Sequence, residues 1–157
     1  VEVRRFLPGQ LQVHLQLPQV DFLHLNKKNQ LFPVDQNGKV LPQLPAHISP
    51  LLPIHRGKTK KINPKTLPLL AHALKALPSV GPFRRGNREE VAWDPVRGLK
   101  LKLLDRPYEI YLGSERVEKK SLQILKVLNY LEKQKHEARV IDGSFRKKVL
   151  VRLRKAS

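Results

Sequence analysis

Residues able to carry out acid–base or metal chemistry are few in this sequence and lack the spacing that such chemistry needs. No pair of histidines has the tight spacing with a nearby carboxylate that holds a metal; the six are His14, His24, His47, His55, His72 and His136. Glu89 and Glu90 are adjacent, so in a strand their carboxylates point to opposite faces and cannot work as an acid–base pair. Cysteine is absent, which removes thiol nucleophiles and thiolate ligands. We therefore expect no metal and no cofactor.

Two short motifs resemble catalytic signatures without meeting their requirements. Gly57-Lys58-Thr59 matches the end of a phosphate-binding loop, but Leu52 stands where the first glycine is required, and no apolar strand precedes it. Ser144 follows Gly143 but lacks the strained turn of a serine nucleophile and a partner base. A solvated basic loop and a turn serine are the simpler interpretations. We predict that the protein is not an enzyme.

The charge of the chain favours an anionic partner. Its 157 residues include 31 lysines and arginines against 13 acids, a formal charge of +18, and 40% are apolar, enough to form a core. The last nineteen residues carry seven bases against Asp142 alone. The basic loops Arg56–Lys61 and Arg84–Arg88 are candidate phosphate contacts, yet the few aromatic residues do not alternate with bases as they do in nucleic-acid readers.

Hydrophobic patterning predicts an α+β fold, a mostly antiparallel sheet with two main helices packed on it. The helices are expected to begin at a capping Thr66 and at Ser114, and residues 42–53 form a proline-rich surface connection. Strands are expected within residues 1–17 on both sides of Pro8-Gly9, and at Val20–Leu25, Leu31–Val34, Glu89–Asp94, Leu99–Leu104, Tyr108–Leu112, Arg139–Phe145 and Val149–Leu153.

Several motifs, taken in order, resemble the FtsQ/DivIB family of bacterial cell-division proteins. Val3–Val13 is similar to the family's V-R-R-x-W-P-x-x-L-x-V hairpin, which closes its POTRA domain, and Pro18 matches the proline of E-R-x-P. Leu31–Val40 resembles the L-V-D-x-x-G-x-V hairpin, followed by the proline-bearing Leu44-Pro45. Downstream, the resemblance continues in Tyr108–Gly113, in Ile141-Asp142 with Phe145, and in Val149–Val151.

The resemblance implies how the chain is divided and where it works. Residues 1–25 would be the C-terminal hairpin of a POTRA-like domain, and residues 26–157 the family's β domain. The family is anchored in the inner membrane by a single helix, which we expect to precede this sequence, with this part facing the periplasm or extracytoplasmic space. The implied function is a non-enzymatic divisome scaffold that binds FtsB/FtsL-type partners.

The C-terminal strand is our candidate for the partner-binding site. A terminal strand is often an edge, and a free edge can accept a partner strand through its backbone. The expected strand residues are Val149, Leu150, Val151 and Leu153. Phe145 would be the aromatic anchor, and Arg146, Lys148 and Arg152 would pair with acids of the partner. The alternative interpretation buries Phe145 in the core and leaves the bases only to protect the edge from aggregation.

Two other functions fit the charge. A basic nucleic-acid-binding module of ribosomal type would use the loops at 56–61 and 84–88, although the motif order makes nucleic acid the second choice. The same loops could instead engage anionic lipid.

Overall fold

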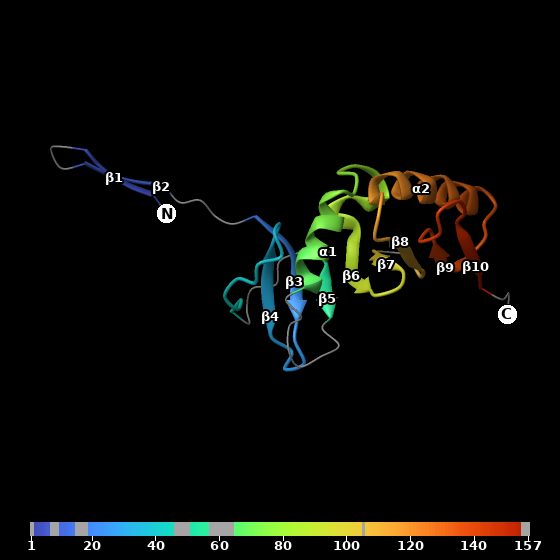
Figure 1. Ribbon diagram of the computed structural model, residues 1–157, viewed down its shortest axis with the longest axis horizontal. Helices are drawn as coiled ribbons and strands as arrows, with labels where there is room; N and C mark the ends of the chain where they lie inside the picture. The colour runs from blue at the N-terminus through green and yellow to red at the C-terminus, as the bar shows by residue number, and fades with distance from the viewer. Residues whose placement is uncertain are drawn as a thin grey trace.

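The computed structural model describes residues 2–6, 10–14, 19–45, 51–56, 65–104 and 106–154 (Figure 1). β1 (Glu2–Phe6) and β2 (Gln10–His14) form an antiparallel hairpin. All other strands belong to one sheet, in the order β10-β9-β8-β7-β6-β5-β3-β4. The turn predicted at Pro8-Gly9, Pro18 and residues 57–61 of the first basic loop lie outside the described residues.

The strands predicted at Val20–Leu25 and Leu31–Val34 are confirmed as the hairpin of β3 (Val20–Leu25) and β4 (Leu31–Asp35), and a tight turn follows β4. The Asp35 carboxylate accepts the backbone N–H groups of Asn37 and Lys39 at 2.8 and 2.9 Å. Gly38 has φ +80°, and a Cβ there would lie 2.4 Å from the nitrogen of Pro68. β3 is paired within the large sheet, and the division of the chain at residue 25 stays a prediction.

A strand that the pattern did not predict links the two halves of the sheet. β5 (Ile54–Arg56) pairs in parallel with β3 and with β6 (Arg88–Asp94). α1 (Thr66–Lys75) and two short 3₁₀ turns, η1 (Gly81–Phe83) and η2 (Arg85–Asn87), connect β5 to β6. The prediction that Thr66 caps α1 is wrong, because Thr66 is already helical and Lys65 takes the capping position.

The C-terminal half contains the predicted meander and the longer helix. β6, β7 (Gly98–Leu103) and β8 (Glu109–Gly113) pair antiparallel as expected. α2 (Val117–Lys133) begins after Arg116, which has φ +52°, so the prediction that it starts at Ser114 is wrong by one turn. β9 (Ala138–Asp142) then pairs in parallel with β8, and β10 (Leu150–Leu153) pairs antiparallel with β9.

The predicted fold class is confirmed, and the sheet is mixed rather than purely antiparallel. Three of its neighbouring pairs are parallel: α1 connects β5 to β6, α2 connects β8 to β9, and β3 pairs with β5, with β4 between them in the chain. β5 and β8 run in the same direction, and the connections from β5 to β6 and from β8 to β9 both move toward the β10 edge of the sheet. Because such connections are right-handed, both helices lie on the same face of the sheet. Residues of both helices and of the strands beneath share one core, including Leu70, Leu74, Val91, Leu99, Leu101, Ile110, Ile124, Leu128 and Ile141. The opposite face of the sheet carries no helix among the described residues.

Candidate functional site

The two edges of the eight-stranded sheet differ. Beyond β4, the segment after the turn lies along the strand: Val40 bridges Val34, and the N–H of Leu41 donates to the Pro33 carbonyl at 2.8 Å. Pro33 itself has no N–H to offer a further strand. At the other end of the sheet, β10 has β9 as its only neighbour among the described strands. The edge at β4 is therefore covered, and the edge at β10 is free.

The register of β10 shows which backbone groups are available. Leu150 lies opposite Asp142 and Arg152 opposite Val140, and the N–H of Arg154 donates to the Glu137 carbonyl at 2.9 Å. Because N–H groups alternate along an antiparallel strand, those of residues 150, 152 and 154 face β9. The N–H and C=O groups of Val151 and Leu153 consequently point outward, as strand addition requires.

The predicted site residues lie along this edge and in the loop before it. Val149 and Val151 pack partly against the core below α2, while Leu150 and Leu153 are 42% and 51% exposed. Val149 precedes β10, which begins one residue later than predicted. Arg152 is exposed on the helix-free side, sharing that face with Val140.

Phe145 lies in the loop between β9 and β10 instead of in a strand. β9 ends at Asp142, whose carboxylate accepts hydrogen bonds from the backbone N–H and the hydroxyl of Ser144 at 2.9 and 2.6 Å. Phe145 follows, 41% exposed, with the Lys148 ammonium 5.4 Å from its ring centre. Phe145 is therefore outside the core and accessible beside the strand edge, with Arg146 exposed next to it.

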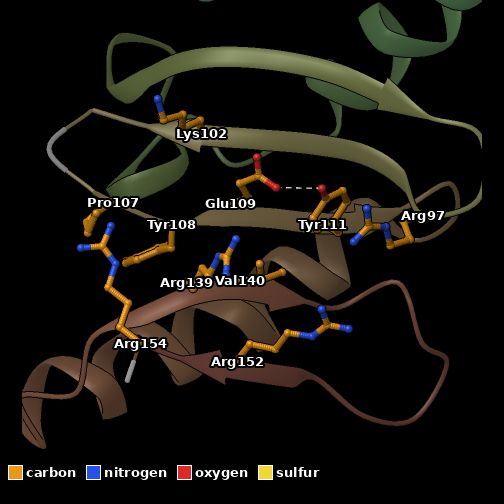
Figure 2. Close-up of a pocket in the computed structure, with 10 residues that line it drawn as sticks. All are labelled: Arg97, Lys102, Pro107, Tyr108, Glu109, Tyr111, Arg139, Val140, Arg152 and Arg154. Atoms are coloured by element: carbon orange, nitrogen blue, oxygen red, sulfur yellow. Dashed lines mark hydrogen bonds between the residues drawn. The ribbon is translucent and has the colours of Figure 1, made fainter. Parts of the chain in front are cut away.

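A groove of about 520 Å³ lies on the helix-free face beside β10. Figure 2 shows its side chains, with Arg154 reaching toward Pro107 and Tyr108 beside the start of β8. Five of the lining residues are cations and one is an acid; the full lining is Arg97, Lys102, Pro107, Tyr108, Glu109, Tyr111, Arg139, Val140, Arg152 and Arg154. The groove therefore favours negatively charged groups next to the free edge.

The single carboxylate of the groove is held by neighbouring donors. Glu109 accepts the Tyr111 hydroxyl at 2.9 Å and the Lys100 ammonium at 2.6 Å, as the dashed line in Figure 2 shows for Tyr111. Burial acts to raise the pKa of Glu109, but these two hydrogen bonds outweigh it and lower the pKa. The Arg97 guanidinium stacks 3.6 Å from the Tyr111 ring centre. This network fixes the floor of the groove.

The other cations of the groove differ in whether a carboxylate of the protein pairs with them. Lys102 lies 3.4 Å from Glu89, and Arg154 lies 3.7 Å from Glu137, both on the solvent side. Arg139 and Arg152 form no ion pair with any carboxylate of the described residues. These two guanidinium groups are thus free to bind a partner's acid.

Sequence reasoning found Arg152 and missed the other groove residues. Lys102 and Glu109 occupy strand positions that alternate with the buried leucines of β7 and Ile110 of β8, which signals a polar sheet face. Arg139 lies at an irregularity of β9, where the register against β10 shifts. Periodicity alone could not have placed Arg139 beside Arg152.

The basic loop at 84–88 does not present its bases as a phosphate-binding patch. Arg88 is buried, and its Nε donates to the Phe83 carbonyl at 2.7 Å. Burial lowers the pKa of Arg88 to about 10. Arg85 lies 3.8 Å from Asp21, leaving Arg84 as the remaining base of the loop. The Nε of Arg84 donates to the Asn87 side-chain oxygen at 2.9 Å, so all three arginines interact with the protein itself.

Neither a cluster of metal ligands nor a membrane-spanning helix is present in the described ranges. No group of three or more His, Asp or Glu residues there could hold a metal ion. In the same part of the chain, no helix has both the length and the apolar character needed to cross a bilayer.

A family model and a solved structure match most of this chain. Residues 23–143 match the family described as cell division protein FtsQ/DivIB, C-terminal. Among solved structures, the chain is similar to the major extracytoplasmic domain of the trans isomer of the bacterial cell division protein DivIB from Geobacillus stearothermophilus. That match has 17% sequence identity and a TM-score of 0.52, and it covers 75% of this chain and 97% of that chain. The likeness to that structure shows a shared fold. The search of curated proteins found no match.

Proposed function

This chain belongs to the FtsQ/DivIB family of cell-division proteins, and from that premise we propose that it is a non-enzymatic scaffold of the divisome. It binds FtsB/FtsL-type partners by accepting a strand at β10. It is held in the inner membrane by a single helix outside this sequence, and this part faces the extracytoplasmic space, as in the DivIB domain of similar fold. The observation that carries the proposal is the free edge of β10 beside a basic groove.

Backbone pairing supplies the first part of the binding energy. The outward N–H and C=O groups of Val151 and Leu153 can pair with an extended segment, which becomes the next strand of the sheet. The β4 edge cannot do the same, because residues 40–44 already cover it. A partner strand therefore has a single position to occupy on the described sheet.

Side chains supply the specificity. Alternate residues of an added strand face opposite sides of the sheet. On the helix-free side they meet Arg152 and the groove, where acids of the partner would pair with Arg139 and Arg152. On the other side they pass near Val151 and toward Phe145, whose exposed ring provides a rigid apolar anchor. Arg146 and Lys148 add positive charge that steers an acidic segment toward this edge.

The test is calorimetric titration of the chain with an acidic, extended peptide from an FtsB-type partner. Val151→Pro removes an outward N–H while leaving the pairing of β10 with β9 in place. Val151→Ala is the matched control, because it shortens the same side chain and keeps the N–H. We expect Val151→Pro to weaken binding about tenfold or more relative to Val151→Ala, as one lost hydrogen bond and a displaced strand together exceed about 1.4 kcal/mol.

Equal affinities of the two variants would remove strand addition from the proposal. Circular dichroism of both variants is the control for folding. A proline variant that folds like the alanine variant and binds as tightly would contradict the assignment of β10.

A further inference from the structure

Three loops meet at the end of the sheet where β6, β8 and β9 finish, because these strands run in the same direction. We call this the loop end; it consists of residues 94–97, 113–116 and 143–148. The N–H of Gly113 donates to the Arg97 carbonyl at 2.9 Å, and the Lys120 ammonium at the start of α2 donates to the Ser144 carbonyl at 2.9 Å. The three loops are therefore tied to one another and present one surface.

Two apolar side chains project from the loop end. Val96, in the turn between β6 and β7, is 91% exposed, and Phe145, in the loop between β9 and β10, is 41% exposed. The turn under Val96 is held by Asp94, whose carboxylate accepts the N–H groups of Val96 and Arg97 at 2.9 and 2.8 Å. Val96 is thus fixed at the tip of an ordered turn, where it makes no contribution to the core.

Positive charge surrounds these apolar residues. Together with Lys120, the loop end carries six cations against two carboxylates: Arg97, Arg116, Lys120, Arg146, Lys147 and Lys148 against Asp94 and Glu115. Asp94 is already paired with Arg97 at 3.3 Å. A cavity of about 320 Å³ opens between the loops, lined by Val96, by three of the cations, Arg116, Lys120 and Arg146, and by one carboxylate, Glu115. Its charge and size suit the phosphate of a lipid headgroup.

We propose that the loop end docks on an anionic phospholipid bilayer. Val96 and Phe145 enter the interfacial region, while the surrounding bases contact headgroup phosphates. Apolar tips within a basic surface distinguish a membrane from a nucleic acid, because the exposed Val96 side chain gains nothing from a phosphate backbone. This inference does not depend on strand addition, and it extends the surface to Val96, Arg116 and Lys147, which the partner-binding site does not include.

The test is flotation of the purified chain with vesicles of phosphatidylcholine alone or with one-quarter phosphatidylglycerol. We expect binding to the anionic vesicles only. Val96→Ser should weaken it about fourfold, since one apolar side chain leaves the interface, whereas Val96→Trp should strengthen it about fivefold. Val80→Ser is the matched control, because Val80 is 74% exposed but lies before β6, at the opposite end of the sheet. It should bind like the wild type.

Charge is tested in the same assay. Lys147→Gln should weaken binding about fivefold, as expected for one base at an anionic surface. Lys126→Gln, on the exposed side of α2, is the matched control and should have no comparable effect.

Three results would overturn the proposal: equal binding to neutral and anionic vesicles, Val96 variants that bind like the Val80 variant, or Lys147→Gln that binds like Lys126→Gln. Binding to anionic vesicles that is unchanged by substitution of Val96 would indicate instead a surface that binds polyanions in general. Titration with the FtsB-type peptide separates this proposal from strand addition, because Val96 variants should bind the peptide with unchanged affinity.

Discussion

Acidification should destabilise this protein through two histidines buried side by side in β3 and β5. His24 and His55 are register partners, 3% and 9% exposed, with ring centres 5.3 Å apart. The Nδ1 of His55 lies 3.2 Å from the Val91 carbonyl, which can only accept, so Nδ1 carries the proton of the neutral ring. The edge of Phe22 covers the same ring at 6.2 Å between centres. A second proton on His55 would place a charge in this apolar site.

The magnitude follows from the pKa of His55. Burial, assisted by His24, lowers this pKa from 6.5 to about 4 against the opposing effect of the Val91 bond. Burial also lowers the pKa of His24. As the pH falls below 6.5, His55 becomes protonated in the unfolded chain. In the folded protein it stays neutral until the pH is near 4. Stability present above pH 6.5 is therefore lost between these values, by about 3 kcal/mol in all and about 2 kcal/mol from pH 7 to pH 5.

The measurement is urea unfolding followed by circular dichroism at pH 7 and pH 5 and constant ionic strength. His55→Asn keeps a donor for the Val91 carbonyl and cannot titrate, so it should lose most of the pH dependence even though it is less stable at pH 7. His72→Asn, at an exposed histidine of α1, is the control and should behave like the wild type. If His55→Asn loses as much stability between the two pH values as the wild type does, the burial of His55 is not the cause.

Two further predictions concern a close backbone contact and the floor of the groove. Gly98→Ala should destabilise the fold by at least about 2 kcal/mol, because Gly98 has φ +69° and a Cβ there would lie 2.1 Å from the carbonyl carbon of Gly113. Gly86→Ala is the control, because a Cβ at Gly86 meets open space. It should change the free energy of unfolding in urea little. Tyr111→Phe removes the 2.9 Å hydrogen bond to Glu109, so it should cost about 1 kcal/mol and raise the pKa of Glu109 in an NMR titration. An unchanged Glu109 pKa would refute the role of the hydroxyl.

Sequence patterns correctly predicted those turns and helices whose conformation depends on residues close together in the chain. Gly38 has a positive φ in the tight turn after Leu31–Asp35, and this turn brings Val40 back to bridge Val34. The long helix shows the limit of this reasoning. Its apolar spacing was clear, but its start was decided by Arg116 adopting a left-handed conformation next to the β6–β7 turn, which no capping pattern encodes.

Tertiary pairing explains what the sequence did not reveal. β5 has three residues after a proline-rich stretch, and it becomes a strand because β3 and β6 lie on both of its sides. Without β5, the helix at Thr66–Lys75 could not be identified as a crossover between parallel strands. The two parallel pairs of β5 were missed for the same reason, whereas the parallel β8–β9 pair was missed although both strands and the helix between them were predicted.

The candidate site divides in a similar way. The position of the last strand at an edge followed from its place in the chain, and β10 is indeed the terminal strand of the sheet. The groove needed the register of four segments, which brings Arg97, Lys102, Arg139 and Arg154 beside Arg152. Phe145 was placed in a strand by its apolar neighbours, but the bonds from Ser144 to Asp142 end that strand first.

The covered edge at β4 also limits how copies of this protein can join one another. A sheet with two free edges can add copies at both sides and grow into a fibre. With the β4 edge covered by residues 40–44, copies of the described eight-stranded sheet can join one another edge to edge only at β10 against β10, which closes after two. Such a pair and a bound partner strand exclude each other because both need the same backbone groups.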